Sequence, residues 1–169
     1  TENGDGNPDE VNFIRKGKNY GYPVCNGYCF PYNPQYKNPM TEIPGNNFTN
    51  YAPTGILFYT SNVMPELTNK LLVVGMGGGE VLRGLLKCDL SNAPFYDSIS
   101  SKNVILDISG YTCLMQGVDG YIYALKYNYN SNPQGRLDRI KQDLSGIQIQ
   151  NHIVGYNLSQ NYPNPFNPV

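Results

Sequence analysis

Short runs of β-branched and aromatic residues alternate with polar residues and turn signals along most of this chain. Apolar runs of this length, bounded by Gly, Pro, Asn and Asp, are typical of β-strands. The pattern predicts strands over Val11–Ile14, Ile56–Tyr59, Lys70–Val74, Glu80–Leu86, Val104–Ile108, Tyr121–Tyr127 and Ile147–Ile153. The best candidate for a helix is the short, polar segment Arg136–Leu144. Many short strands joined by hairpin turns indicate an all-β sandwich, barrel or propeller.

The composition supports this fold class and excludes several functions. The chain has 169 residues with 12 Lys and Arg against 13 Asp and Glu, a net charge of −1. Because nucleic acids and anionic membranes attract a basic excess, neither is an expected partner. No apolar run approaches the ~20 residues of a membrane-spanning helix, so we expect no transmembrane segment. The content of Gly, Pro and Tyr (18, 13 and 15 residues) favours turns and strands.

A long segment without periodicity, Gly21–Tyr51, is rich in Tyr, Pro and Asn. Such a stretch is usually functional or an elaborated loop. The tyrosines of residues 20–36 could stack on sugar rings, because they combine an apolar face with a polar edge. The favoured alternative is a loop that packs on itself beneath a disulfide.

The four cysteines also leave alternatives. Cys25-Asn-Gly-Tyr-Cys29 encloses a small loop around a glycine, which favours a local disulfide. Cys88 and Cys113 would then form a second pair or remain buried thiols. A zinc site is disfavoured, because the sole His152 is distant and no second closely spaced pair of cysteines is present. An even number of cysteines suits an oxidising compartment.

The chain begins with an acidic segment that carries oxygen ligands on alternate residues. Asp5-Gly-Asn7-Pro-Asp9-Glu10 resembles the first half of a calcium loop, since calcium takes several oxygen ligands. It lacks the closing bidentate Glu of an EF-hand. An acidic turn before a strand, with no metal, explains the same spacing.

Four motifs, in the same order and spacing, resemble those of the soluble glucose/sorbosone dehydrogenase family. They are Asp9–Pro23, which reads DEVNFIRKGKNYGYP, then Ala52–Tyr59, Asn69–Gly75 with Val81-Leu-Arg83, and Val118–Tyr123. The resemblance extends over roughly residues 1–127 and corresponds to the C-terminal half of a six-bladed β-propeller. It therefore implies an all-β fold of about three blades. Because three blades leave open sheet edges, it also implies a partner, the missing N-terminal half.

The resemblance implies a cofactor and metal sites. Many members use pyrroloquinoline quinone and calcium, and the carbonyls of Gly4 and Asp5 fall where the family holds the cofactor-bound calcium. Asp9, Glu10 and the carbonyl of Tyr20 fall on a structural calcium site. Oxidation of a sugar or polyol hydroxyl is the implied activity. The catalytic histidine would belong to the N-terminal half, and His152 is interpreted as a surface or linker residue.

This chain departs from the family where the quinone is contacted. The family's cationic residues fall near Gly77, Gly110 and Thr112, none of which is charged. A tricarboxylate needs cationic donors. The departures favour an alternative, a non-catalytic surface, scaffold or carbohydrate-binding propeller that keeps structural calcium.

The end of the chain resembles something else. Leu158-Ser-Gln-Asn-Tyr-Pro-Asn-Pro-Phe-Asn-Pro168 is similar to the opening of the C-terminal sorting domain of the bacterial type IX secretion system. This resemblance implies a protein exported across the outer membrane, either secreted or on the cell surface. An ordinary Pro-rich linker is the alternative. The sequence thus divides into the propeller half, 1–154, and an extended linker with the start of a sorting domain, 155–169.

Overall fold

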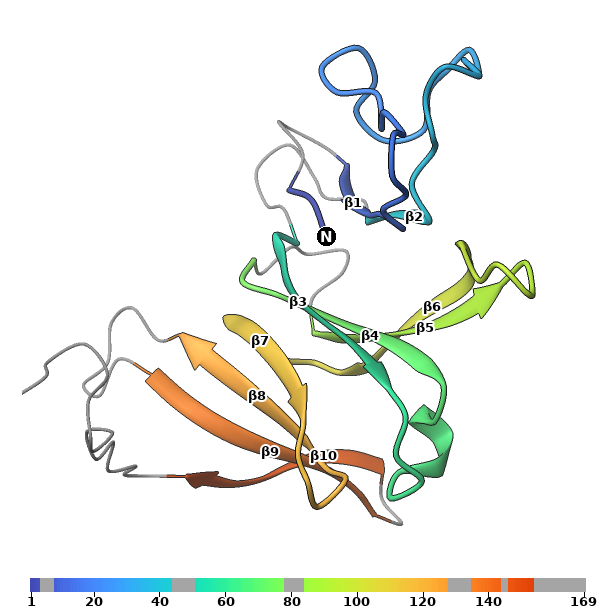
Figure 1. Ribbon diagram of the computed structural model, residues 1–169. Helices are drawn as coiled ribbons and strands as arrows, with labels where there is room; N and C mark the ends of the chain where they lie inside the picture. Colours follow the sequence, from blue (N-terminus) through green and yellow to red (C-terminus); the bar gives the residue numbers. More distant parts are fainter. Residues whose placement is uncertain (4–7, 44–50, 78–83, 128–134, 144–145, 154–169) are drawn as a thin grey trace, which may run out of the picture.

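The computed structural model describes residues 1–3, 8–43, 51–77, 84–127, 135–143 and 146–153, without the side chains of 143 and 150–153 (Figure 1). The described residues form strands and one 3₁₀ turn, η1 (Pro65–Leu67), with no α-helix among them. The strands are β1 (Asp9–Val11), β2 (Thr41–Ile43), β3 (Pro53–Tyr59), β4 (Lys70–Gly75), β5 (Leu85–Ser91), β6 (Ser98–Leu106), β7 (Tyr111–Gln116), β8 (Ile122–Tyr127), β9 (Gly135–Asp143) and β10 (Gly146–Ile153). The predicted all-β class is confirmed.

The strands form two four-stranded antiparallel sheets and one two-stranded sheet. The larger sheets have the orders β3-β4-β5-β6 and β10-β9-β8-β7, so consecutive strands are hydrogen-bonded neighbours. A repeated four-stranded meander is the unit of a propeller blade. Strands β1 and β2 pair above the β3–β6 sheet, on the side away from the β7–β10 sheet (Figure 1). The chain thus forms two complete blades and part of a third, which agrees with the predicted partial propeller of about three blades.

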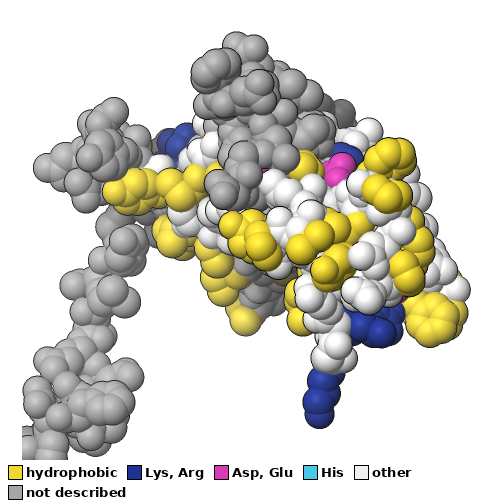
Figure 2. Space-filling view, turned by 90° about the horizontal axis from the view of Figure 1, so that it is seen from above, with side chains coloured by type: hydrophobic (Ala, Val, Ile, Leu, Met, Phe, Trp, Pro, Cys, Tyr) yellow, Lys and Arg dark blue, Asp and Glu magenta, His cyan; other side chains and the backbone are white. Residues whose placement is uncertain are grey.

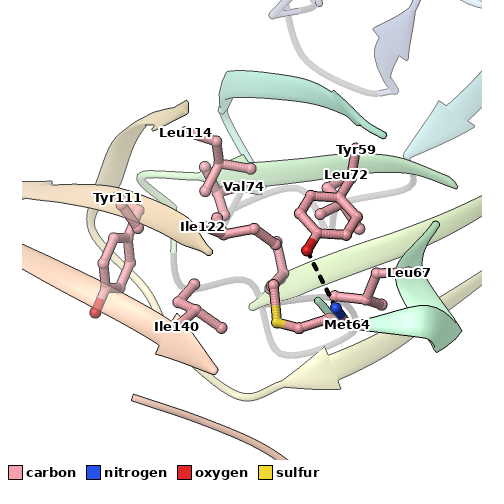
Figure 3. Close-up of a cluster of buried hydrophobic side chains, with 11 residues drawn as sticks. Tyr59, Met64, Leu67, Leu72, Val74, Tyr111, Leu114, Ile122 and Ile140 are labelled. Atoms are coloured by element: carbon pink, nitrogen blue, oxygen red, sulfur yellow. Dashed lines mark hydrogen bonds between the residues drawn. The ribbon is translucent and has the colours of Figure 1, made fainter. Parts of the chain in front are cut away.

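Two apolar clusters hold these sheets together. The larger lies between the two four-stranded sheets and contains Tyr59, Met64, Leu67, Leu72, Val74, Leu85, Tyr111, Leu114, Ile122, Ala124 and Ile140 (Figure 3). The smaller joins β1 and β2 to the β3–β6 sheet through Val11, Met40, Ile43, Tyr51, Val73, Leu86 and Cys88. The hydroxyl of Tyr59 accepts a hydrogen bond from the amide of Met64 (Figure 3) and donates to the carbonyl of Gly120. The core therefore fixes η1 against the second blade.

One predicted element is wrong. The segment Arg136–Leu144, favoured as a helix, forms strand β9 instead. Leu137 and Ile140 are three residues apart, which is a helical spacing. In the structure Asp138 and Ile140 are the buried residues, so the true period is two. Because the buried residue Asp138 is polar, the alternation of buried and partly exposed positions in β9 could not be recognised from the apolar residues.

Other boundaries shift by a few residues. The first strand was predicted over Val11–Ile14 but is β1, whose first two residues are buried acids. The predicted Glu80–Leu86 lies partly outside the described residues, and its strand, β5, extends to Ser91. Strands β2 and β7 were not predicted. Of the described residues, none belongs to a helix with the length and hydrophobicity to span a membrane.

Candidate functional site

The two acidic residues that begin β1 point in different directions. Both Asp9 and Glu10 are buried. Asp9 Oδ2 accepts a hydrogen bond of 2.9 Å from the amide of Ala52, and Glu10 Oε1 accepts one from the amide of Gly27. Successive side chains on a strand lie on opposite faces. Asp9 therefore binds the backbone just before β3. Glu10 instead binds the loop between β1 and β2, which contains Gly27.

Glu42 on β2 lies directly opposite Glu10 in the antiparallel register. Cβ atoms of such a pair are about 4.5–5.5 Å apart, so the two carboxylates share one face. Glu42 Oε1 accepts a hydrogen bond from the amide of Tyr28, the residue after Gly27. Partial burial, and then the charge of Glu42, raise the pKa of the Tyr28 hydroxyl. The loop thus offers two consecutive backbone amides to two opposed carboxylates.

Asn12 completes this cluster on the Glu10 side. Its Nδ2 donates to Glu10 Oε2 at 2.9 Å and to Glu2 Oε2 at 3.1 Å. Its Oδ1 is buried and has no hydrogen-bond partner in the structure. A buried acceptor without a donor costs free energy, and calcium prefers such oxygen ligands. Glu10 and Glu42 place two carboxylates on one face, and Asn12 directs its Nδ2 donor, not its Oδ1, toward Glu10.

The predicted ligands are only partly brought together. Gly4 and Asp5 lie outside the described residues. Asp9 faces away from Glu10, and Tyr20 uses its hydroxyl to donate to the carbonyl of Phe13. Within the described ranges, no three residues among His, Cys, Asp and Glu are grouped to hold a metal ion. Calcium ligation by Asp9, Glu10 and the Tyr20 carbonyl stays a prediction.

Sequence reasoning missed Asn12 and Glu42. Asn12 follows Glu10 by two residues within the DEVN motif, so the strand period could have placed it on the same side. Glu42 had no local signal, because its position depends on the pairing of β1 with β2 across a long loop.

The three positions expected to contact the quinone carry no cation in the structure. The amide of Gly77 donates to the carbonyl of Tyr51, and Thr112 Oγ1 donates to the carbonyl of Leu125. Gly110 has a left-handed φ of 78°. A Cβ on Gly110 would lie 3.5 Å from Lys126 Cε, so Lys126 places a positive charge at that corner. These described residues do not reproduce a three-cation quinone site.

The structure contains one disulfide and two free cysteines among the described residues. Cys25 and Cys29 form the predicted disulfide. Cys88 is a buried free thiol whose pKa is raised to about 11 by burial, and Cys113 is an exposed free thiol. The alternative in which Cys88 pairs with Cys113 is therefore wrong.

Comparison with known proteins gives the family. The sequence profile of the Glucose / Sorbosone dehydrogenase family matches residues 1–138. The chain belongs to the glucose/sorbosone dehydrogenase family. An uncharacterized protein of Synechocystis sp. is 31% identical to this family member over 150 residues, which cover 83% of the chain and 33% of that relative.

Solved structures agree with the fold of this family member. A putative oxidoreductase (glucose dehydrogenase) from Thermus thermophilus superposes with a TM-score of 0.60 at 23% identity, over 78% of this chain and 36% of that one. A structure titled glucose dehydrogenase gives a TM-score of 0.62 at 21% identity, over 85% and 40% of the two chains. The chain thus has the fold of part of a sugar dehydrogenase-like propeller and spans about a third of its curated relative's length.

Proposed function

We propose that the protein containing this chain oxidises a hydroxyl group of a sugar or polyol, using pyrroloquinoline quinone and calcium. The observation that carries the proposal is the family match over residues 1–138, which includes the whole Asp9–Pro23 motif. The catalytic residue is not assigned within this chain. The histidine expected to accept the hydroxyl proton belongs to the N-terminal half.

The role proposed for this chain's own residues is to hold structural calcium and to order the loops around it. Calcium would neutralise the opposed carboxylates of Glu10 and Glu42. Asp9 acts from the other side of β1, where its carboxylate holds the amide of Ala52. These contacts fasten the segment between β1 and β2 to the first blade. The Gly4 and Asp5 carbonyls remain proposed ligands of the cofactor-bound calcium.

The partner proposed for this chain is the N-terminal half of the propeller. Met115 on β7 with Leu125 and Tyr127 on β8 leave large apolar side chains exposed on the second blade. Cys113 pairs with Leu125 across the same two strands. A sheet that is apolar on both faces normally has a further layer packed against it. The relatives supply the length for such blades, since this chain covers 33–40% of them.

We also propose that the protein is secreted or displayed on the cell surface. The Cys25–Cys29 disulfide suits an oxidising compartment. The resemblance of Leu158–Pro168 to a type IX sorting domain indicates the export route, and this segment lies outside the described residues.

A second candidate function has its own observation. Gly77, Gly110 and Thr112 provide no cation for the carboxylates of the quinone. If the quinone does not bind for this reason, the chain belongs to a non-catalytic, calcium-stabilised scaffold or carbohydrate-binding propeller.

Dye reduction separates the two candidates. The full-length protein, incubated with the quinone and calcium, is assayed with a panel of sugars and polyols and an artificial electron acceptor. If the protein oxidises sugars or polyols, we expect turnover that requires both the quinone and calcium and that is absent when EDTA is present from the start. Absence of turnover with every substrate would refute the oxidation and support the non-catalytic candidate.

A further inference from the structure

The disulfide loop between β1 and β2 borders a half-open hollow of about 490 Å³. Its walls include Asn26, Tyr28, Phe30, Tyr32 and Asn33, beside the Cys25 end of the disulfide. Ligand pockets commonly have volumes of about 300–1,000 Å³. Figure 2 looks onto the end of the molecule that carries this loop, where many hydrophobic side chains lie exposed and a few charged ones are visible beside them.

The aromatic rings of this hollow are unusually open to solvent. Phe30 is 99% exposed and Tyr32 is 69% exposed, and Tyr28 is nearly half exposed. Water-exposed rings gathered at one hollow indicate a binding surface more than a folding role, because they contribute little to the core. The interpretation in which these rings pack on one another inside the loop is therefore wrong for Phe30 and Tyr32.

The backbone beneath the rings is held in place. The carbonyl of Gly21 accepts hydrogen bonds from the amides of Val24 and Cys25, at 2.7 and 2.9 Å. The amides of Gly27 and Tyr28 are fastened to Glu10 and Glu42. With the disulfide, these contacts form the hollow before any ligand arrives. A preformed site loses less conformational entropy on binding.

The chemistry of the walls specifies the ligand. None of the described residues that line the hollow has a charged side chain, which favours a neutral ligand. The side-chain amide of Asn33 accepts a hydrogen bond of 3.0 Å from the backbone amide of Gln35 at its Oδ1, and its Nδ2 carries donors that match hydroxyl groups. Tyr and Phe rings offer apolar faces on which a flat ring can stack. A proline-rich peptide would use the rings, and its carbonyls would accept from the amide N–H groups, but it offers few donors to the amide oxygens, whereas a sugar hydroxyl both donates and accepts.

We propose that the hollow around Phe30 and Tyr32 binds the pyranose rings of a neutral oligosaccharide. The site is specified by the loop alone and needs no quinone. This proposal rests on the carbohydrate-binding function proposed above and assigns the binding site to this hollow. The rings would stack on the apolar faces of the sugar, and the side-chain amides would pair with its hydroxyls.

Calorimetric titration of the full-length protein, without added quinone, tests this site. The probes are short neutral oligosaccharides of the cello-, malto-, xylo- and chito-series. At least one series is expected to bind saturably, and Phe30→Ala and Tyr32→Ala are each expected to weaken its affinity about tenfold. Since both side chains are exposed, the melting temperature should change little. Phe95→Ala removes a ring that is also exposed but does not line the hollow, and it should leave the affinity within about twofold.

The proposal would be overturned by no binding of any series, by equal affinity of the wild-type protein and both hollow variants, or by an equal loss of affinity in Phe95→Ala. Tighter binding of a proline-rich peptide than of every oligosaccharide would also overturn it. Because the titration contains no quinone, its failure differs from a failure of oxidation, which the dye assay detects separately.

Discussion

Glu10 and Glu42 lie directly opposite each other in the pairing of β1 with β2, and each accepts a hydrogen bond from a neighbouring amide of the disulfide loop. Like charges placed directly opposite each other on a sheet repel, which is destabilising. The amides of Gly27 and Tyr28 offset part of that repulsion. A calcium ion would remove the rest, which links metal binding to the conformation of the loop.

The exchange of Glu42 for Gln separates repulsion from metal binding. Glu42→Gln keeps an Oε1 acceptor for the Tyr28 amide but removes the charge. In EDTA we expect the variant to melt at the same or a higher temperature than the wild-type protein. With calcium at a hundred times its dissociation constant, the wild-type protein should gain about 2.7 kcal/mol and the variant much less.

Glu66→Gln is the control, because Glu66 is exposed in η1 and away from this face. It should respond to calcium as the wild-type protein does. A melting temperature of the wild-type protein that is the same in calcium and in EDTA would contradict the proposed site.

A pair of glycine substitutions measures how closely the loop approaches Glu42. A Cβ on Gly27 would clash with Glu42 Oε1, whereas a Cβ on Gly17 meets nothing within 4 Å. Both glycines have left-handed φ angles, 84° and 74°. Gly17→Ala should therefore cost about 1 kcal/mol of unfolding free energy from the backbone alone. Gly27→Ala should cost about 2–4 kcal/mol, because overpacking is added. Equal losses in denaturant titrations would show that the close contact is absent.

Buried acids explain which parts of the fold the sequence could predict. Short runs of β-branched and aromatic residues between turn signals predicted most strands of the two blades. Asp138 interrupts this pattern in β9, where it is fully buried beside Arg136, whose guanidinium donates to it at 2.7 Å. The Tyr111 hydroxyl also donates to Asp138. Burial and this carboxylate raise the pKa of Tyr111 to about 12, so the hydroxyl keeps its proton at neutral pH. Because Asp138 is polar, the sequence pattern placed it on the solvent face of a helix, although it lies at a core position of β9.

The candidate site was predictable to a similar extent. Asp9 and Glu10 were found from their motif, and the Cys25–Cys29 disulfide from its spacing. That Asp9 faces away from Glu10 required knowing that the two residues begin a strand. The pairing of Glu10 with Glu42 depends on long-range strand register, which short-range patterns do not specify.

Loss of the disulfide should loosen the same loop. The double change Cys25→Ser with Cys29→Ser is expected to lower the unfolding free energy by about 2 kcal/mol, the loop-closure value for so short a loop. It should also weaken calcium binding, because the Gly27 and Tyr28 amides lose their restraint. Cys113→Ser is the control, since that thiol is free and exposed. Denaturant titration with and without calcium measures both effects, and an unchanged stability of the double variant would refute the role of the disulfide.

Asp97 predicts a loss of stability in acid. The side chain of Asn92, followed by Lys37 and Arg15, holds the pKa of Asp97 below its ordinary value of 3.8. A lowered folded-state pKa means that the stabilisation is complete above pH 3.8 and is lost as the pH falls through the folded value. The melting temperature of Asp97→Asn should thus fall less steeply below pH 4 than that of the wild-type protein. Glu66→Gln should retain the wild-type slope, and parallel curves for Asp97→Asn would contradict the assignment.

Cofactor uptake tests the proposal that the protein containing this chain oxidises a sugar or polyol with pyrroloquinoline quinone. Full-length protein with calcium is titrated with pyrroloquinoline quinone, and the bound quinone is followed by its absorbance after removal of the free cofactor. The account predicts saturation near one quinone per protein at micromolar concentration, and loss of uptake in EDTA. No uptake in the presence of calcium would contradict it and leave the non-catalytic propeller as the function.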